Sequence, residues 1–228
     1  RRIRPRSLRS DRAAPLGVTV SGNTKADWLD THRMPTVRNI ARGVHSFTSN
    51  AFLVEGDRTV LVDAGSNFDA VDRIGDAVDA LDAIVLTHTH PDHIGNVESV
   101  VDAFEVAVWG FDPDRDLVDH AIADGDAVAI GDDRYDVLHT PGHKNDHVCL
   151  HSPAAGTLFA GDLVFANGGF GRTDLPEGDH TKLIESIEYL LSAVDGSLST
   201  MYVGHGPTVD ADPIHHVELA LQAARMSN

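Results

Sequence analysis

Residues 87–93 read THTHPDH, and they come directly after the apolar run AIVL that starts at Ala83. The run is short, uninterrupted and bounded by polar residues, which predicts a buried strand over Ala83–Thr87. His88 and His90 are two residues apart, so both imidazoles project from one face while the backbone stays extended. Imidazole is a ligand for borderline divalent metals such as Zn²⁺. The end of this strand is therefore a candidate metal site.

The same motif carries a second group of ligand-type side chains. Pro91 turns the chain after His90 and lets Asp92 and His93 return on a different side. Three imidazoles and one carboxylate thus fall within six residues. The spacing predicts two adjacent sites, one supplied by His88 and His90 and the other by Asp92 and His93.

Three further residues of ligand type occur downstream in similar contexts. Each follows a run typical of a strand and lies beside glycine, which permits close approach of the backbone. They are His143 in TPGH (140–143), Asp162 in FAGD (159–162) and His205 in VGHGP (203–207). Loops at strand ends commonly carry function, so these residues are candidate ligands as well.

The succession HTHPDH, TPGH, AGD and VGHGP resembles the five-motif pattern of the metallo-β-lactamase superfamily, over residues 37–210. The resemblance implies an α/β (α+β) fold, a four-layer αββα sandwich with a metal site at one edge of its two sheets. Asp63, which closes the run TVLVD, matches the first motif of the superfamily. By resemblance, this aspartate supports the metal-binding loop without binding metal itself.

The resemblance also assigns the ligands of two divalent metal ions. One ion has three histidines, the other has two histidines and a carboxylate, and a further carboxylate bridges both. The sets are His88, His90 and His143; Asp92, His93 and His205; and the bridging Asp162. Zn²⁺ is the expected metal, with Fe²⁺ or Mn²⁺ as alternatives. Such a pair of ions lowers the pKa of a water toward ~7, and the hydroxide, positioned through Asp92 and His93, attacks a carbonyl.

Residues 171–179 contain GRTD and GD, similar to a stretch of short glyoxalase II-like (hydroxyacylglutathione hydrolase-like) enzymes and of the related persulfide dioxygenases. The first branch implies a thioesterase-like metallohydrolase that cleaves a thioester or a related ester. The second implies a mononuclear non-haem iron enzyme, with one Fe²⁺ on His88, His143 and Asp162. A non-catalytic metal-binding protein is the third alternative, against which the complete ligand set argues.

Two cationic residues near these motifs are candidates for substrate binding. Lys144 follows His143 and either attracts an anionic substrate at the mouth of the site or is a solvated loop lysine. Arg172 either forms a structural ion pair, which we favour, or holds an anionic substrate. We expect His147 to be structural and not a ligand, and the single cysteine, Cys149, to be a buried packing residue. The expected partner is a small-molecule thioester or a low-molecular-weight thiol.

Strand-like and helix-like runs alternate along the rest of the chain. They predict one domain over residues 16–228, preceded by a disordered Arg-rich tail over residues 1–15 that lacks the apolar segment of a secretory signal. The expected strands are Ala51–Glu55, Thr59–Asp63, Ala83–Thr87, Glu105–Trp109, Val128–Ile130, Tyr135–Leu138, His147–Leu150, Leu158–Ala160 and Met201–Val203. The expected helices are Asp69–Leu81, Ile94–Val101, Thr181–Ala193, which Asp179 caps, and Pro213–Arg225.

Charge and cysteine content limit the class of protein. The 228 residues include 35 acidic and 18 basic side chains, a formal net charge of −17. Such a surface repels phosphate backbones and makes nucleic acid an unexpected partner. One cysteine cannot form an intramolecular disulfide, and no apolar run reaches the ~18 residues that a membrane span needs. A soluble cytoplasmic protein is therefore expected.

The acidic surface also leads to a hypothesis about salt. Like charges on a compact chain repel one another, and salt screens that repulsion. If the protein is halophilic, its melting temperature should rise between about 0.1 and 3 M KCl, as measured by circular dichroism. A midpoint that is indifferent to salt would identify an ordinary acidic mesophilic protein instead.

Overall fold

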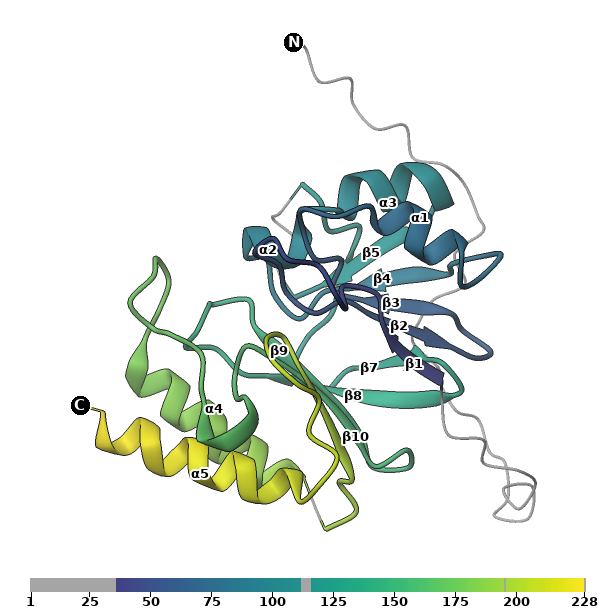
Figure 1. Cartoon of the computed structure of the whole chain (residues 1–228). Helices are drawn as coiled ribbons and strands as arrows, with labels where there is room; N and C mark the ends of the chain where they lie inside the picture. The colour runs from purple at the N-terminus through teal and green to yellow at the C-terminus, as the bar shows by residue number, and fades with distance from the viewer. Residues whose placement is uncertain (1–35, 112–115, 195, 228) are drawn as a thin grey trace, which may run out of the picture.

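The computed structural model describes residues 36–111, 116–194 and 196–227 (Figure 1). The Arg-rich tail expected over residues 1–15 lies outside these ranges. Two mixed β-sheets lie face to face, and helices cover the outer face of each sheet. This arrangement confirms the αββα sandwich. No helix within the described ranges is both long and apolar enough to cross a membrane.

The first sheet contains the strands of the N-terminal half. Its order is β1 (Thr36–Asn39), β2 (Phe52–Glu55), β3 (Val60–Val62), β4 (Ala83–Val85), β5 (Ala107–Gly110) and β6 (His120–Ala121). Strands β1, β2 and β3 pair antiparallel, whereas β3, β4, β5 and β6 pair parallel. Strands β3 and β4 therefore end at the same edge of the sheet.

The second sheet contains the strands of the C-terminal half. Its order is β11 (Thr200–Val203), β10 (Thr157–Gly161), β9 (Val148–Ser152), β8 (Asp133–His139) and β7 (Ala127–Ile130). Strand β9 runs antiparallel to both β8 and β10, and β11 runs parallel to β10. Strands β8, β10 and β11 consequently share one direction and also end at a common edge.

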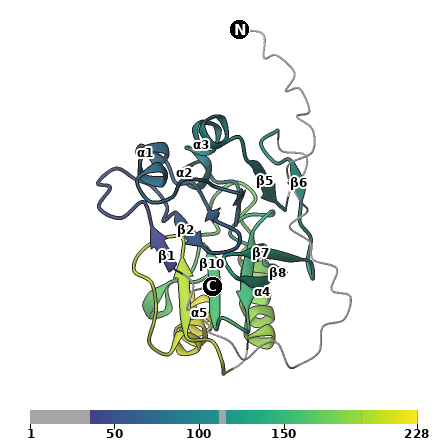
Figure 2. The same ribbon diagram turned by 90° about the vertical axis from the view of Figure 1, so that its right-hand side faces the viewer.

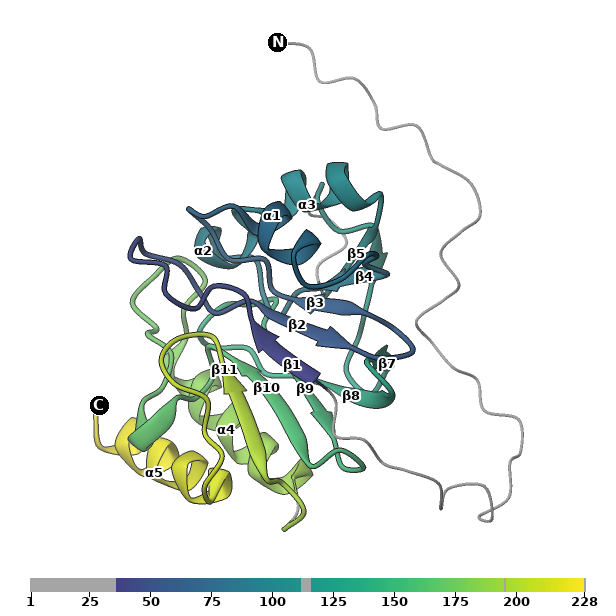
Figure 3. The same ribbon diagram turned by 45° about the vertical axis from the view of Figure 1, so that its right-hand side comes forward.

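Helices enclose the sandwich from both sides, as Figures 2 and 3 show from two further directions. On the first sheet lie α1 (Ala70–Gly75), α2 (Pro91–Ile94) and α3 (Val97–Phe104). On the second lie α4 (His180–Ala193) and α5 (Pro213–Met226), next to the short 3₁₀ helix η1 (Ala166–Gly168). Asp179 caps α4 as expected, because its carboxylate accepts a hydrogen bond from the amide of Lys182.

Alternation along the strands divides the core into three apolar layers. In β2, Phe52 and Val54 point into the layer between the sheets, and Leu53 points toward α1 and α3. In β9, Leu150 belongs to the layer between the sheets, whereas Cys149 belongs to the layer under α4 and α5. Cys149 is fully buried, which confirms its packing role.

Three local features differ from the sequence expectations. Helix α1 ends at Gly75, well before Leu81, because glycine and the following aspartates favour a helix end. The helix expected over Ile94–Val101 is divided into α2 and α3, since Asn96 is hydrogen-bonded to the backbone of Ala64 and Gly65. Strands β1 and β6 are short, lack a fully buried face and gave no sequence signal.

Candidate metal centre

The predicted ligands gather at the edge where five strands of the two sheets end. Asp63 follows β3, and the residues of the THTHPDH motif occupy the end of β4 and helix α2 (Figure 1). The loops after β8, β10 and β11 supply His143, Asp162 and His205. Chain segments that are far apart in sequence meet here because parallel strands end on the same side.

Three imidazole nitrogens converge in a first group. The Nδ1 atom of His90 lies 3.1 Å from His88 Nε2 and 2.8 Å from His143 Nε2. These three atoms lie close enough together to share one metal ion. The structure thus brings together the three histidines that the resemblance assigned to the first ion.

The opposite ring nitrogens of His88 and His143 have fixed partners. Thr87 Oγ1 donates its proton to Asp63, so at 3.1 Å it accepts from His88 Nδ1. His143 Nδ1 donates to the carbonyl of Arg172 at 2.8 Å. In both imidazoles the Nε2 atom that faces the group therefore carries a lone pair, the form that binds a metal.

A second group forms around Asp92, His93 and His205. The Nε2 atom of His205 lies 3.0 Å from Asp92 Oδ2, and His93 Nε2 lies 3.9 Å from the same oxygen. These are the three residues assigned to the second ion, and their ligand atoms again lie within reach of one cation.

Asp162 lies between the two groups. Its Oδ2 atom is 3.4 Å from His143 Nε2 in the first group and 3.4 Å from His205 Nε2 in the second. Its Oδ1 atom is 3.3 Å from His93 Nε2. Gly204 makes room for this carboxylate, since a Cβ atom at that position would overlap Asp162 Oδ1.

Two buried atoms at this junction indicate that a cation fits the residues present. His93 Nε2 and Asp162 Oδ1 face each other at 3.3 Å, and neither makes a well-directed hydrogen bond to a described residue, although both are shielded from solvent. Buried polar atoms are normally paired, and an unpaired one costs about 1–3 kcal/mol. A metal ion ligated by both atoms would remove that cost.

Asp63 supports the motif without joining either group. Its Oδ1 and Oδ2 atoms accept from the amide and hydroxyl of Thr87 at 2.8 and 2.7 Å, and Oδ2 also accepts from His93 Nδ1 at 2.8 Å. The backbone of Asp63 is left-handed, with φ = 57°, a conformation that occurs at functional sites. This carboxylate therefore directs His93 Nε2 toward Asp162.

Burial keeps the imidazoles of the first group neutral. It is the largest cause that lowers the pKa of His88 and of His143. Burial also lowers the pKa of His90 to about 4, assisted by the charges of His143 and Lys144. Neutral imidazole is the form that binds metal.

In the second group, the neighbouring carboxylates determine the direction in which the pKa values of the histidines shift. Burial acts to lower the pKa of His93, but Asp63 and Asp162 outweigh it and raise that pKa. Burial also acts to lower the pKa of His205, but hydrogen bonds with Asp162 and Asp92 raise it to about 9. These histidines in turn lower the pKa of Asp92 and of Asp162, although burial acts to raise both. The site thus concentrates negative charge that a divalent cation would neutralise.

His147 has a larger part in the site than the sequence indicated. It is fully buried, and its Nε2 atom accepts from the backbone amide of Asp162 at 2.9 Å, while Nδ1 donates to Thr140 Oγ1 at 2.8 Å. Burial lowers the pKa of His147 to about 3, which keeps it a neutral acceptor. It is structural, as expected, and it holds the loop that carries Asp162.

Lys144 is buried and not solvated. Its ammonium lies 3.3 Å from Asp146 Oδ1 and donates to Glu177 Oε2 at 3.0 Å. Asp146 accepts from Thr89 Oγ1 at 2.5 Å, and Thr89 stands between His88 and His90. The pair Lys144–Asp146 therefore braces the metal-binding loop from behind.

Arg172 lies on the surface and forms an ion pair with Asp174. Its guanidinium donates two hydrogen bonds to Asp174, at 2.7 and 2.6 Å, and its side chain is 61% exposed. Only the carbonyl of Arg172 contacts the site, through His143.

The fold is an αββα sandwich, and the site consists of histidine and aspartate clusters at one edge of it. Together they indicate the class of protein to which this chain belongs. The chain belongs to the metallo-beta-lactamase superfamily, whose family model matches residues 46–205. It is 35% identical to a hydroxyacylglutathione hydrolase of Aeromonas salmonicida over 171 residues, 73% of this chain and 65% of the relative. The chain thus spans slightly less than two thirds of that relative's length.

Solved structures with sequence similarity have the same fold. The BLEG-1 B3 metallo-beta-lactamase superimposes with a TM-score of 0.63 at 30% identity, over 76% of this chain and 93% of that one. TTHA1623 in a di-iron-bound form superimposes with a TM-score of 0.63 at 28% identity, over 83% and 96% of the two chains.

The position of Asp162 leads to a prediction about metal content. Asp162→Asn keeps the side-chain shape but replaces one carboxylate oxygen by an amide group that cannot ligate in the same way. We expect this variant to lose most of its metal, measured by plasma mass spectrometry after gel filtration. The matched exposed change Asp210→Asn should retain the parent's content. Equal metal in Asp162→Asn and the parent would refute the shared role of this carboxylate.

The burial of Lys144 leads to a prediction about stability. Lys144→Met leaves Asp146 as an uncompensated buried charge and should lower the free energy of unfolding by about 3–5 kcal/mol, measured by urea denaturation. The double change Lys144→Met/Asp146→Asn removes that charge and should recover much of the loss. Unchanged stability in the single variant would contradict the bracing role.

Proposed function

We propose that this protein is a metal-dependent hydrolase that cleaves a thioester or related ester, as glyoxalase II-like enzymes do. The single observation that carries the proposal is the arrangement of two ligand groups around one shared carboxylate, Asp162. Two divalent ions, for which Zn²⁺ is the first choice, would supply a hydroxide nucleophile at neutral pH and a Lewis acid for the carbonyl oxygen.

The residues of this chain have distinct tasks in such a reaction. His88, His90 and His143 are held as neutral ligands, so none of them competes for the proton of the attacking water. Asp92 and Asp162 provide the negative charge that retains a second cation. Similarity to the Aeromonas hydrolase over most of this chain supports thioester cleavage as the reaction.

A persulfide dioxygenase with a single Fe²⁺ is the second candidate. The observation in its favour is that His88, His143 and Asp162 supply two imidazoles and one carboxylate, a set common in non-haem iron oxygenases. The di-iron form of TTHA1623, at 28% identity, adds that iron occupies a protein of this fold.

Metal analysis combined with two assays distinguishes the candidates. Protein purified without added metal is analysed for zinc, iron and manganese, while thiol release from thioesters and oxygen uptake on glutathione persulfide are followed in the same sample. The hydrolase should contain about two metals per chain and release thiol without consuming oxygen. About one iron per chain with oxygen uptake would favour the dioxygenase instead.

Asp162→Asn is the control for both assays. If a contaminating enzyme caused the measured activity, the preparations of the variant and of the parent would have the same rate. Thiol release at the same rate by parent and variant would therefore contradict the proposal.

A further inference from the structure

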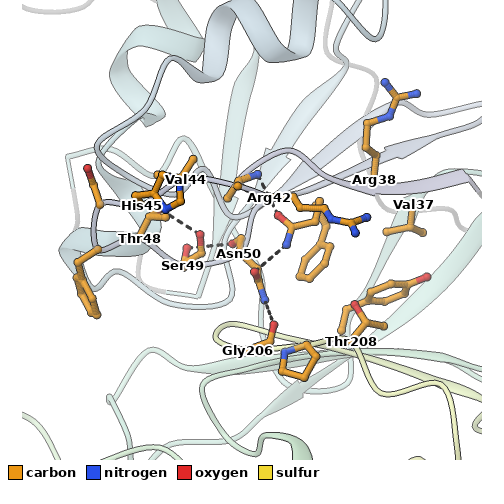
Figure 4. A pocket seen from close by; sticks show the side chains of 18 residues that line it. Val37, Arg38, Arg42, Val44, His45, Thr48, Ser49, Asn50, Gly206 and Thr208 are labelled. Carbon is orange, nitrogen blue, oxygen red and sulfur yellow. Dashed lines mark hydrogen bonds between the residues drawn. The ribbon is translucent and has the colours of Figure 1, made fainter.

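A groove of about 980 Å³ includes Phe47, whose ring stacks on His205 of the candidate metal centre. Figure 4 shows side chains that line this groove. One wall is formed by β1 and by the loop over residues 41–50, and the other by residues 206–208, which follow the ligand His205. Phe52 and Tyr202, with ring centroids 5.1 Å apart, also line it. Of the motifs that supply candidate ligands, VGHGP contributes Gly206 and Pro207 to this groove, and the other lining residues come from outside those motifs.

The groove and the metal centre share a wall. Phe47, at the near end of the groove, is 75% exposed, and its ring stacks on that of His205 with centroids 5.7 Å apart. Ser49 donates from both its amide and its hydroxyl to the carbonyl of Asp92, at 3.3 and 3.1 Å. A ligand that extends from the metal centre past Phe47 would therefore enter the groove.

Hydrogen bonds fix the two walls relative to each other. Asn50 Nδ2 donates to the carbonyls of Val203 and Gly206 at 2.7 and 3.0 Å, as Figure 4 shows for Gly206. Asn39 Nδ2 donates to Asn50 Oδ1 at 2.7 Å and completes the link to β1. The groove is thus formed before any ligand binds, which reduces the entropy cost of binding.

The charge of the groove is opposite to that of the molecule. The described residues that line it include Arg38, Arg42 and His45, and among them is neither aspartate nor glutamate. The whole chain, by contrast, has 35 acidic residues among 228 and a net charge of −17. An aromatic and cationic groove in an acidic protein is suited to an anion.

The two arginines differ in their availability. Arg38 forms an ion pair with Glu55 at 3.4 Å, and in Figure 4 its side chain points away from the other lining residues. Arg42 is exposed and has no ion-pair partner within the described ranges, and its side chain extends among the lining residues. Its guanidinium is therefore available to a ligand.

The turn that carries Arg42 is held in place. Arg73 donates to the carbonyls of Ile40 and Arg42 at 2.6 and 3.1 Å, and Gly43 provides the left-handed turn with φ = 81°. The fixed backbone limits the region that the Arg42 side chain can reach, and a planar guanidinium can donate two parallel hydrogen bonds to a carboxylate.

We propose that this groove binds the anionic end of the substrate, with Arg42 as the contact for its carboxylate. The proposal rests on the proposed function, because the bond to be cleaved lies at the metal centre. It specifies the substrate as a thioester with a carboxylate at one end and an apolar portion that lies against the half-buried Tyr202 and the exposed Phe47.

Three thioesters test which end carries the charge. S-Acetyl-2-mercaptoethanol is neutral, S-succinyl-2-mercaptoethanol carries a carboxylate on the acyl half, and S-acetylmercaptosuccinate carries carboxylates on the thiol half. KM and kcat are measured for the metal-loaded parent, Arg42→Gln and Arg42→Glu. Loss of a charged hydrogen bond should raise KM for one of the two anionic esters about 10- to 100-fold and leave kcat for that ester unchanged. KM and kcat for the neutral ester should both stay the same.

Arg134→Gln is the matched control, since Arg134 is a surface arginine of β8 paired with Asp136 outside the groove. It should leave the kinetics for all three esters unchanged. Arg42→Glu should raise KM further than Arg42→Gln, because it adds repulsion. The anionic ester that responds identifies the acyl or the thiol half. Equal KM changes for all three esters in Arg42→Gln, or none, would overturn the proposal.

Binding of non-hydrolysable probes separates failure of this proposal from failure of the proposed function. The thioether counterparts of the three esters, with a methylene in place of the carbonyl, are titrated calorimetrically into the same metal-loaded proteins. Even if the parent hydrolyses no thioester, tighter binding of an anionic thioether to the parent than to Arg42→Gln supports the groove. Equal binding of every probe to the two proteins contradicts it.

Discussion

The carboxylate of Asp63 is the interaction on which the rest of the metal centre depends. It accepts three hydrogen bonds, from the amide and hydroxyl of Thr87 and from His93 Nδ1, and so ties the end of β3 to the end of β4 and to α2. Its effect reaches both ligand groups. Through Thr87 it determines which nitrogen of His88 carries the proton, and it determines the same for His93 directly. One buried side chain, in a left-handed backbone conformation, thereby orients imidazoles in both groups of candidate ligands.

The other ligands are held by partners from different parts of the chain. The amide of Asp162 donates to the buried ring of His147, and His143 donates to the carbonyl of Arg172. Each partner is a neutral acceptor, so the ligands are oriented without adding charge to a site that already contains three carboxylates. Lys144 supplies the one buried ammonium nearby, and Asp146 and Glu177 compensate it. Hydrogen bonds thus preorganise the centre. Its carboxylates and its unpaired buried atoms are the groups that a metal cation would neutralise and bind.

The candidate ligands could be selected from the sequence because each lies in a short motif directly after a strand, and strand ends are visible as apolar runs. Parallel pairing then brings those motifs to one edge without further information. The surroundings could not be predicted in the same way. Lys144 looked like a loop residue because its partner Glu177 is 33 residues away, and the link between Asn50 and Gly206 spans 156 residues. Such contacts leave no periodic signal in the sequence, and the short, half-exposed strand β1 that carries the groove was missed for the same reason.

Charge connects the metal centre with the groove beside it. An anionic substrate approaching this protein meets a molecule with a net charge of −17, and the carboxylates of the centre repel it at short range unless cations neutralise them. If Arg42 binds the substrate as proposed, it would also supply positive charge in the groove beside the centre. Arg42 is exposed, so salt screens it too, but screening weakens interactions over a Debye length of about 8–10 Å more than it weakens a contact at hydrogen-bond distance. High salt would therefore reduce the general repulsion more than the direct contact of a carboxylate with Arg42. An acidic surface and an anionic substrate are therefore compatible, provided that the positive charge lies in the groove.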